Sequence, residues 1–133
     1  MPTIKRFEDL EGWKLVRELC SKLGQLIDND TFTKNFRFIA QMEGSSGSIM
    51  DNIAEGFERG SKAEFLVFLG YSKGSCGELR SQLYSALDRK YISNEQFQEL
   101  HLLAVRISEI LQKLLPTSRT QTFRASERST PNH

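Results

Sequence analysis

The sequence predicts an all-α protein, an up-down-up-down bundle of four helices joined by short turns. In four successive stretches, apolar residues recur at every third or fourth position, which is the period of a helix with one buried face. Only three prolines occur, at positions 2, 116 and 131, so the middle of the chain is free to be helical. The 133 residues fit one domain, which we expect over residues 1–116, followed by a polar tail over 117–133.

The first helix is predicted over residues 9–27. Glu8, Asp9 and Glu11 place negative charge near the positive end of its dipole. Residues 28–30, Asp-Asn-Asp, end it because these side chains compete for backbone hydrogen bonds. Its apolar stripe comprises Leu10, Trp13, Val16, Cys20, Leu23 and Ile27, and Leu15, Leu19 and Leu26 widen it.

The second helix is predicted over residues 34–59, with Thr33 as its N-cap. Its stripe comprises Phe32, Phe36, Ile39, Met42, Ser46, Ile49, Ile53 and Phe57. The run Gly-Ser-Ser-Gly-Ser at 44–48 lies inside it, and each glycine in a helix interior costs about 1 kcal/mol against alanine. Because the apolar pattern resumes in phase, we expect one helix with a kink or a close helix crossing there. A break into two helices is the alternative.

The turn after the second helix has the clearest local signals. Gly60 can adopt the positive φ that is common just after a helix. Ser61 is then expected to cap the third helix, and Glu64, three residues later, completes a capping box. The third helix, over residues 62–89, therefore runs antiparallel to the second. Its stripe comprises Phe65, Phe68, Leu69, Ser72, Cys76, Leu79, Leu83, Ala86 and Leu87, with Phe68 expected as a central buried aromatic residue.

A second surface of the third helix is rich in glycine. Three glycines in one helix lower its stability by about 3 kcal/mol relative to alanine, a loss with no compensation if the glycines have no role. Small residues at these positions would let the backbone of another helix approach closely. We therefore expect a subunit contact on this surface; the alternative is that the glycines are merely tolerated. The residues expected at the contact are Val67, Gly70, Tyr71, Gly74, Gly77 and, off the stripe of the fourth helix, Leu102 and Val105.

Residues 89–92 make the last turn, and Ser93 with Gln96 forms a second capping box. The fourth helix follows and ends at Pro116. Its stripe comprises Phe97, Leu100, Leu103, Ala104, Ile107, Leu111 and Leu114. The tail over 117–133 is expected to be disordered, because it holds little apolar surface. A weak basic arm for RNA or an acidic partner is the alternative.

Charge and hydropathy exclude several classes of protein. The net charge of +1 gives no strong global field toward nucleic acid or acidic partners. No apolar run approaches the roughly 18 residues of a membrane span, and none resembles a signal peptide, so we expect a cytoplasmic protein with no membrane partner. Cys20 and Cys76 fall at core-facing positions and are expected to be small buried hydrophobic residues; a disulfide is the alternative.

No group of residues predicts catalysis. His101 and His133 have no second histidine or cysteine at metal-ligand spacing. The chain has no phosphate-binding loop, dinucleotide fingerprint or nucleophile elbow. Glutamates at 55, 58, 64 and 78 lack the Glu-x-x-His repeat of di-metal sites in helical bundles. We therefore predict no enzymatic activity, catalytic residue, metal, cofactor or small-molecule substrate.

A polar edge runs along the second helix through Asn52, Glu55 and Arg59, pointing away from the apolar stripe. The interpretation that we favour is a solvated face with a weak Glu55–Arg59 pair. A polar seam between subunits, or a contact for a ligand, is the alternative.

Several motifs, in order along residues 7–115, resemble those of a known family. They are Phe7-Glu8-Asp9-Leu10-Glu11-x-Trp13, Asn52-Ile53-Ala54-Glu55-Gly56-Phe57-x-Arg59, Ser61-Lys62-x-Glu64-Phe65-x-x-Phe68-Leu69 and Gly74-Ser75-x-x-Glu78-Leu79-x-x-Gln82-Leu83. They look like the motifs of the four-helix-bundle proteins encoded in intervening sequences of bacterial 23S ribosomal RNA genes, the S23 family. The accessory variability proteins of diversity-generating retroelements are a related branch.

The resemblance implies an up-down four-helix bundle, a ring-like homo-oligomer that is a pentamer, and no enzymatic activity. It also implies association with structured RNA; in the retroelement branch, RNA and a reverse transcriptase are bound through basic surfaces. Asn52, Glu55, Arg59 and Glu78 fall in the matching motifs and would form a polar seam.

The chain departs from the family pattern where RNA binding is concerned. The arginine pair that usually follows the glutamine of the second helix is replaced, after Gln41, by Met42 and Glu43, and the usual proline before Asn52 is missing. Fewer cations weaken the phosphate contacts that dominate non-specific affinity for nucleic acids. We expect an oligomeric scaffold or adaptor whose partner is a further copy of itself. The alternative is an RNA-binding module, working with structured RNA or a protein partner, that uses Lys34, Arg37, Arg59, Lys62 and Lys73.

Overall fold

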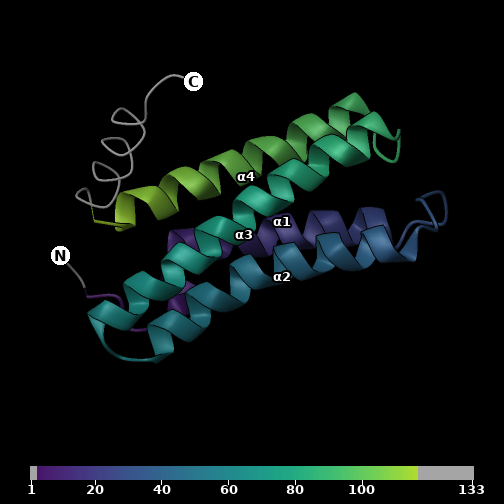
Figure 1. The fold of residues 1–133 in the computed structure, drawn as a ribbon. Coiled ribbons are helices and arrows are strands. Elements are labelled where there is room, and N and C mark those ends of the chain that lie inside the picture. The colour runs from purple at the N-terminus through teal and green to yellow at the C-terminus, as the bar shows by residue number, and fades with distance from the viewer. Residues whose placement is uncertain (1–2, 117–133) are drawn as a thin grey trace, which may run out of the picture.

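Four long helices form an antiparallel bundle in the computed structural model, which describes residues 3–116 (Figure 1). A short 3-10 helix, η1 (Phe7–Asp9), precedes α1 (Glu11–Ile27), α2 (Phe36–Glu58), α3 (Lys62–Asp88) and α4 (Asn94–Leu114). No strand occurs over residues 3–116. The predicted fold class is therefore confirmed, while the tail predicted over 117–133 lies outside the described residues.

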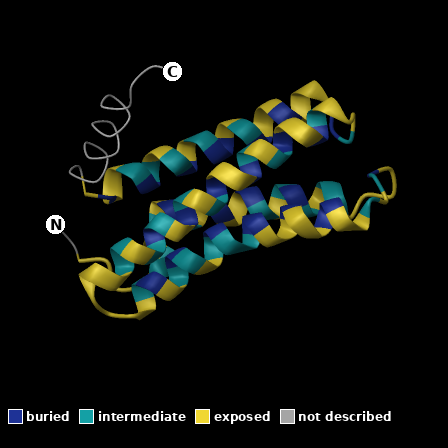
Figure 2. Ribbon diagram, viewed as in Figure 1, coloured by how far each residue is buried: buried dark blue, intermediate teal, exposed yellow. Residues whose placement is uncertain are grey.

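Each helix packs against two others, α1 against α2 and α4, and α3 against α2 and α4. The apolar stripes meet in one core, and Figure 2 shows buried positions recurring along each helix with exposed positions between them. The largest side chains with almost no exposure are Leu19, Leu23, Met42, Ile49, Ile53, Leu69, Leu79, Leu83, Leu100, Ile107 and Leu111. Burial of these side chains is the main source of stability, because helices of this kind are marginal in isolation.

The buried face of α1 is rotated from the predicted stripe. Leu19, expected only to widen the stripe, is completely buried, whereas Cys20 and Trp13 are half-buried. The reason is that α1 packs against both α2 and α4, so its buried face centres between the two contacts. Its predicted start at Asp9 was also wrong, because Leu10 has extended backbone angles and separates η1 from α1.

The start of α2 differs from the prediction. Asn35, not Thr33, is its N-cap, and Asn35 Oδ1 accepts a hydrogen bond from the Phe38 amide at 3.2 Å. Thr33 Oγ1 instead accepts from the Asn35 amide at 3.1 Å, in the turn before the helix. The helix therefore begins two residues later than predicted, and Phe36, expected in the core, is 71% exposed.

The other caps follow the sequence closely. Gly60 has a φ of 84°, and Ser61 Oγ accepts from the Glu64 amide at 3.1 Å. The predicted capping box at this turn lacks its second half, since the Glu64 carboxylate accepts from Ser61 Oγ rather than from the Ser61 amide. At α4 the capping box is complete, with Ser93 Oγ and the Gln96 side chain bonding each other's backbone amides.

The close approach of α2 to a neighbouring helix lies one turn from its end, not at the glycine-serine run. A Cβ on Gly44 or Gly47 would meet no heavy atom within 4 Å, and α2 runs through both without a break, which excludes the two-helix alternative. On Gly56 a Cβ would lie 2.6 Å from Phe68 Cβ. Phe68 is half-buried rather than central to the core, and its ring lies over the backbone of α2.

Aromatic rings join α3 to α4 near the opposite end of the bundle. The His101 ring stacks on Phe97, with centroids 4.9 Å apart and planes at 21°, and the Tyr84 ring meets it edge-on at 5.2 Å. Burial, and to a lesser extent the nearby Arg80 cation, lower the pKa of His101 below its usual 6.5. His101 is therefore a neutral packing residue near pH 7.

We predict that Gly56→Ala destabilises the protein by about 1–3 kcal/mol, because the added methyl group collides with Phe68 Cβ in a packed contact. Gly47→Ala, in the same helix but in open space, serves as the matched control and should stabilise by up to about 1 kcal/mol. Urea unfolding followed by circular dichroism measures both. Equal stability of the two variants would contradict the close approach.

We also predict that the free energy of unfolding falls as the pH drops below 6.5. In that range His101 is protonated in the unfolded chain but stays neutral in the folded chain, where its pKa is lower. The loss continues down to the lower pKa of the folded state and then levels off. His101→Gln removes this contribution, so its free energy of unfolding should depend less steeply on pH over the same interval. Parallel curves for the two proteins would show that burial does not perturb His101.

Candidate functional site

The predicted contact surface lies on the outer sides of α3 and α4. Val67, Tyr71 and Leu102 are 48%, 59% and 62% exposed. A Cβ on Gly74 or Gly77 would meet no atom within 4 Å. Gly70 and Val105 are half-buried.

A groove between α3 and α4 is lined in part by one member of this set, Val105. It has a volume of about 350 Å³ and is lined by Lys73, Arg80, Val105, Ser108, Glu109, Gln112 and Lys113. The thiol of Cys76 donates to the Ala104 carbonyl oxygen at 3.2 Å, which places the middle of α3 beside the middle of α4. Val67, Tyr71 and Gly74 share the exposed side of α3 because they are spaced four and three residues apart. The exposed members of the set therefore form a patch on α3 (Val67, Tyr71, Gly74 and Gly77) and a patch on α4 (Leu102).

A seam of polar contacts joins α2 to α3 within the chain. Ser45 Oγ donates to Glu78 Oε1 at 2.6 Å, and the hydroxyls of Ser48 and Ser75 lie 2.9 Å apart. Asn52 Nδ2 donates to the carbonyl oxygen of Ser48 at 2.8 Å and to its hydroxyl at 2.9 Å. Two members of the predicted polar seam, Asn52 and Glu78, thus have partners inside the subunit.

The serines of this seam are not among the predicted site residues, because the glycines of the run at 44–48 are its more conspicuous feature. The signal that could have found them is the three-residue spacing of Ser45 and Ser48, which puts both hydroxyls toward one neighbouring helix. Ser72 adds a buried contact, donating from Oγ to the Ile49 carbonyl oxygen at 2.7 Å. Ser45 and Ser48 of α2, together with Ser72 of α3, therefore bond the two helices to each other.

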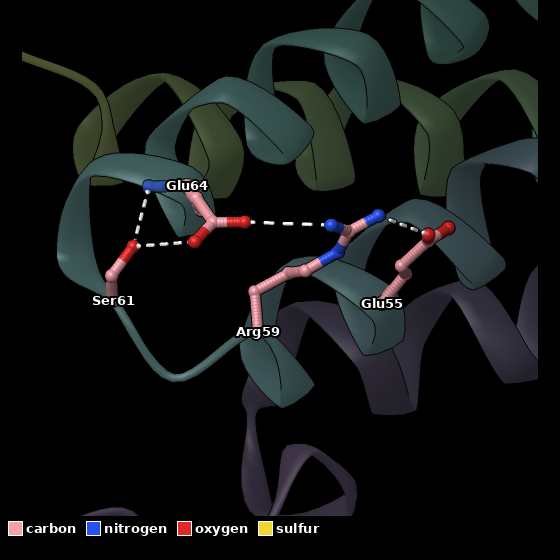
Figure 3. A network of polar contacts seen from close by, with 4 residues as sticks. All are labelled: Glu55, Arg59, Ser61 and Glu64. Carbon is pink, nitrogen blue, oxygen red and sulfur yellow. Dashed lines mark hydrogen bonds and ion pairs between the residues drawn. The ribbon is translucent and has the colours of Figure 1, made fainter.

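Arg59 belongs to a separate network at the α2–α3 turn (Figure 3). Its guanidinium group lies between two carboxylates, with Nη2 at 3.0 Å from Glu55 Oε1 and Nη1 at 3.5 Å from Glu64 Oε2. It also lies over the Phe68 ring, 5.0 Å from its centroid. All three charged groups are about half exposed, so each pair contributes at most about 1 kcal/mol. Arg59 therefore stabilises the turn. Its positive charge is balanced by the two carboxylates, which weakens its attraction for any other anion.

The five cations proposed to contact RNA do not form one cluster. Lys34 and Arg37 lie at the start of α2, while Arg59 and Lys62 lie beyond its other end. The 23 residues of α2 separate the pairs by about 35 Å at 1.5 Å per residue. Lys73 lines the α3–α4 groove. Arg37 instead shares a hollow of about 290 Å³ with Asn35, Phe38, Gln41 and Arg89.

Both thiols are held in the protonated form. Cys76 is buried, and its burial raises the pKa of the thiol to about 11. Burial also raises the pKa of Cys20, whose thiol donates to the Ser46 carbonyl oxygen at 3.4 Å. Neither cysteine is paired in a disulfide. At neutral pH, therefore, neither side chain supplies the thiolate that a nucleophile requires.

Residues 3–116 contain neither a metal-binding cluster nor a membrane-spanning helix. No group of three or more histidine, cysteine, aspartate or glutamate side chains in this range could hold a metal ion. No helix in it is both long enough and apolar enough to cross a membrane.

The fold is shared with a solved structure. A crystal structure of a protein of unknown function from the S23 ribosomal protein family of Bacteroides thetaiotaomicron VPI-5482 aligns with a TM-score of 0.72 and 22% sequence identity. The alignment covers 80% of this chain and 99% of that one. At this identity the likeness concerns the fold alone. No curated protein matches the sequence.

The sequence also matches a protein family, described as 23S rRNA-intervening sequence protein, over residues 8–113. The matched range runs from η1 almost to the end of α4 and includes the α2–α3 seam and both exposed patches. The resemblance drawn from the motifs is thereby confirmed. The chain belongs to the 23S rRNA-intervening sequence protein family.

Proposed function

We propose that this protein is a non-enzymatic scaffold or adaptor that works as a ring of identical subunits, a pentamer. The observation that carries the proposal is the set of large apolar side chains left exposed on α3 and α4. Val67, Tyr71, Tyr84 and Leu102 are each about half exposed or more. Exposed tyrosine and leucine side chains on neighbouring helices suit a protein interface better than they suit open water.

The glycines of α3 support the same surface. Gly74 and Gly77 lie on the exposed side of helix α3, and a Cβ added at either position would meet no heavy atom within 4 Å. A helix of a second subunit can therefore approach the backbone of α3 there, with Tyr71 beside it as a bulky anchor. The patch on α3 and the patch on α4 differ in composition, so a contact between one and the other would be head-to-tail. Such contacts close into rings when the rotation between subunits allows it.

The absence of catalysis in the proposal rests on the state of the reactive groups. Both thiols are protonated at neutral pH, and His101 is neutral, stacked on Phe97 and met edge-on by Tyr84. The carboxylates of Glu55 and Glu64 are engaged by Arg59. These groups have structural partners rather than a common cavity.

We predict that native mass spectrometry at micromolar concentration finds assemblies of the 15.2-kDa chain, with the pentamer as the main species. The double variant Tyr71→Glu/Leu102→Glu should dissociate to monomers, because it buries two charges at the proposed contact. Phe36→Glu is the matched control, since Phe36 is 71% exposed but lies at the start of α2. A monomeric wild-type protein, or equal dissociation by the control, would refute the proposal.

A second candidate function is an RNA-binding accessory module, acting on structured RNA or with a reverse transcriptase. The family description favours it, since it refers to an intervening sequence of 23S rRNA. The exposed cations Lys34, Arg37 and Lys62 are available for phosphate contacts. Against it stand the separation of these cations along α2 and the neutralisation of Arg59 by two carboxylates.

If RNA is bound through these cations, we predict that the logarithm of affinity falls with the logarithm of salt concentration with a slope of about −2 to −4. Lys34→Gln/Arg37→Gln and Lys62→Gln/Lys73→Gln should each make the slope shallower by about 1–2. Filter binding with a structured RNA and a DNA duplex measures this. No binding of either nucleic acid at low salt would eliminate the candidate.

A further inference from the structure

We propose that the hollow between the start of α2 and the end of α3 binds a phosphate group. Its lining residues are Asn35, Arg37, Phe38, Gln41 and Arg89, and its volume of about 290 Å³ lies near the lower end of the range for ligand pockets. This site shares no residue with the proposed subunit contact on α3 and α4. The inference therefore does not depend on self-association.

Two guanidinium groups that are distant in the sequence converge on this hollow. Arg37 comes from the first turn of α2, and Arg89 is the residue that follows α3. Over residues 3–116, neither forms an ion pair, in contrast to Arg6 and Arg59, which bind carboxylates. Arg89 Nη1 donates only to the Tyr91 hydroxyl, at 3.4 Å. Planar guanidinium groups with unused donors suit the oxygens of a phosphate.

The walls of the hollow are held in place before any ligand binds. The Asn35 side chain is fixed at both ends, since Oδ1 accepts from the Phe38 amide at 3.2 Å and Nδ2 donates to the Tyr91 hydroxyl at 3.3 Å. The Tyr91 ring packs edge-on against Phe38, with centroids 5.3 Å apart. Preorganised walls reduce the ordering cost of binding.

The backbone after α3 is equally constrained. Lys90 has a φ of 63°, and the Tyr91 amide donates to the Ala86 carbonyl oxygen at 2.8 Å. This turn carries Arg89 and Tyr91 toward the start of α2. Hydrogen bonds from Asn35, and then from Arg89, lower the pKa of the Tyr91 hydroxyl. The two donors to the Tyr91 hydroxyl oxygen, Asn35 Nδ2 and Arg89 Nη1, belong to residues that line the hollow.

The chemistry of the lining favours phosphate over a carboxylate. Two cations and the amides of Asn35 and Gln41 line the hollow, and no carboxylate does. A carboxylate offers two oxygens, whereas a phosphate group offers at least three acceptor oxygens in a tetrahedral arrangement. Donors that approach from two different helix ends can therefore all be used by one phosphate. That phosphate can belong to a small molecule or to the backbone of an RNA strand.

The test is a titration of the full-length, ¹⁵N-labelled protein in phosphate-free buffer with inorganic phosphate, ADP and a short single-stranded RNA. We expect saturable shifts of the Arg37, Gln41 and Arg89 amide resonances. Arg37→Gln and Arg89→Gln should each weaken binding about tenfold or more, because each removes charge-assisted hydrogen bonds. Arg106→Gln removes another exposed arginine, one on α4 that does not line the hollow, and should leave binding unchanged.

The three probes separate the sources of the phosphate. Arginine-dependent binding of phosphate and ADP supports the site and assigns a small-molecule ligand. Arginine-dependent binding of RNA alone supports the site and assigns a nucleic-acid backbone. Failure of all three probes to saturate, or an equal loss in Arg106→Gln, would overturn the proposal. Unchanged amide spectra outside the hollow in Arg37→Gln and Arg89→Gln show that these variants remain folded.

Discussion

The antiparallel contact between α2 and α3 is the constraint on which the rest of the molecule depends. At one end of this contact, Gly60 and the N-cap Ser61 form the turn that joins the two helices. Just before that turn, the backbone of α2 lies so close to Phe68 that only glycine fits at position 56. Along its length, hydroxyl groups of Ser45, Ser48 and Ser72 are bonded across the interface. Small residues permit the approach, and the hydroxyls satisfy polar groups that it buries.

The surfaces that remain for partners lie at separate places on the subunit. Between Arg37 and Arg59 the chain has no lysine or arginine, so the cations of α2 lie at its two ends and do not form a continuous basic face. On α3, Val67 and Tyr71 stay exposed, and the Tyr71 ring meets Phe68 edge-on with centroids 5.7 Å apart. The exposed apolar side chains of α3 and α4 and the hollow lined by arginines share no residue.

How far each site could be predicted depended on whether its residues are neighbours along the chain. The exposed set on α3 follows from spacing within one helix, and the Glu55–Arg59 pair follows from a separation of four residues. The hollow needs Arg37 and Arg89 to meet, which requires the path of the chain between them. Likewise, Glu78 could be recognised as part of a motif, but its partner Ser45 could not, because that contact joins two helices.

By itself, the sequence determined the four helices, their antiparallel order and most of their caps, because apolar period, glycine and capping side chains act within a few residues. The family match over residues 8–113 follows from the same local motifs. Only the tertiary structure decided which glycine carries a close contact, Gly56 rather than Gly44 or Gly47. It also decided the rotation of α1, which buries Leu19 more deeply than Cys20. Both depend on how one helix is turned toward another, and side-chain spacing along a single helix cannot specify that rotation.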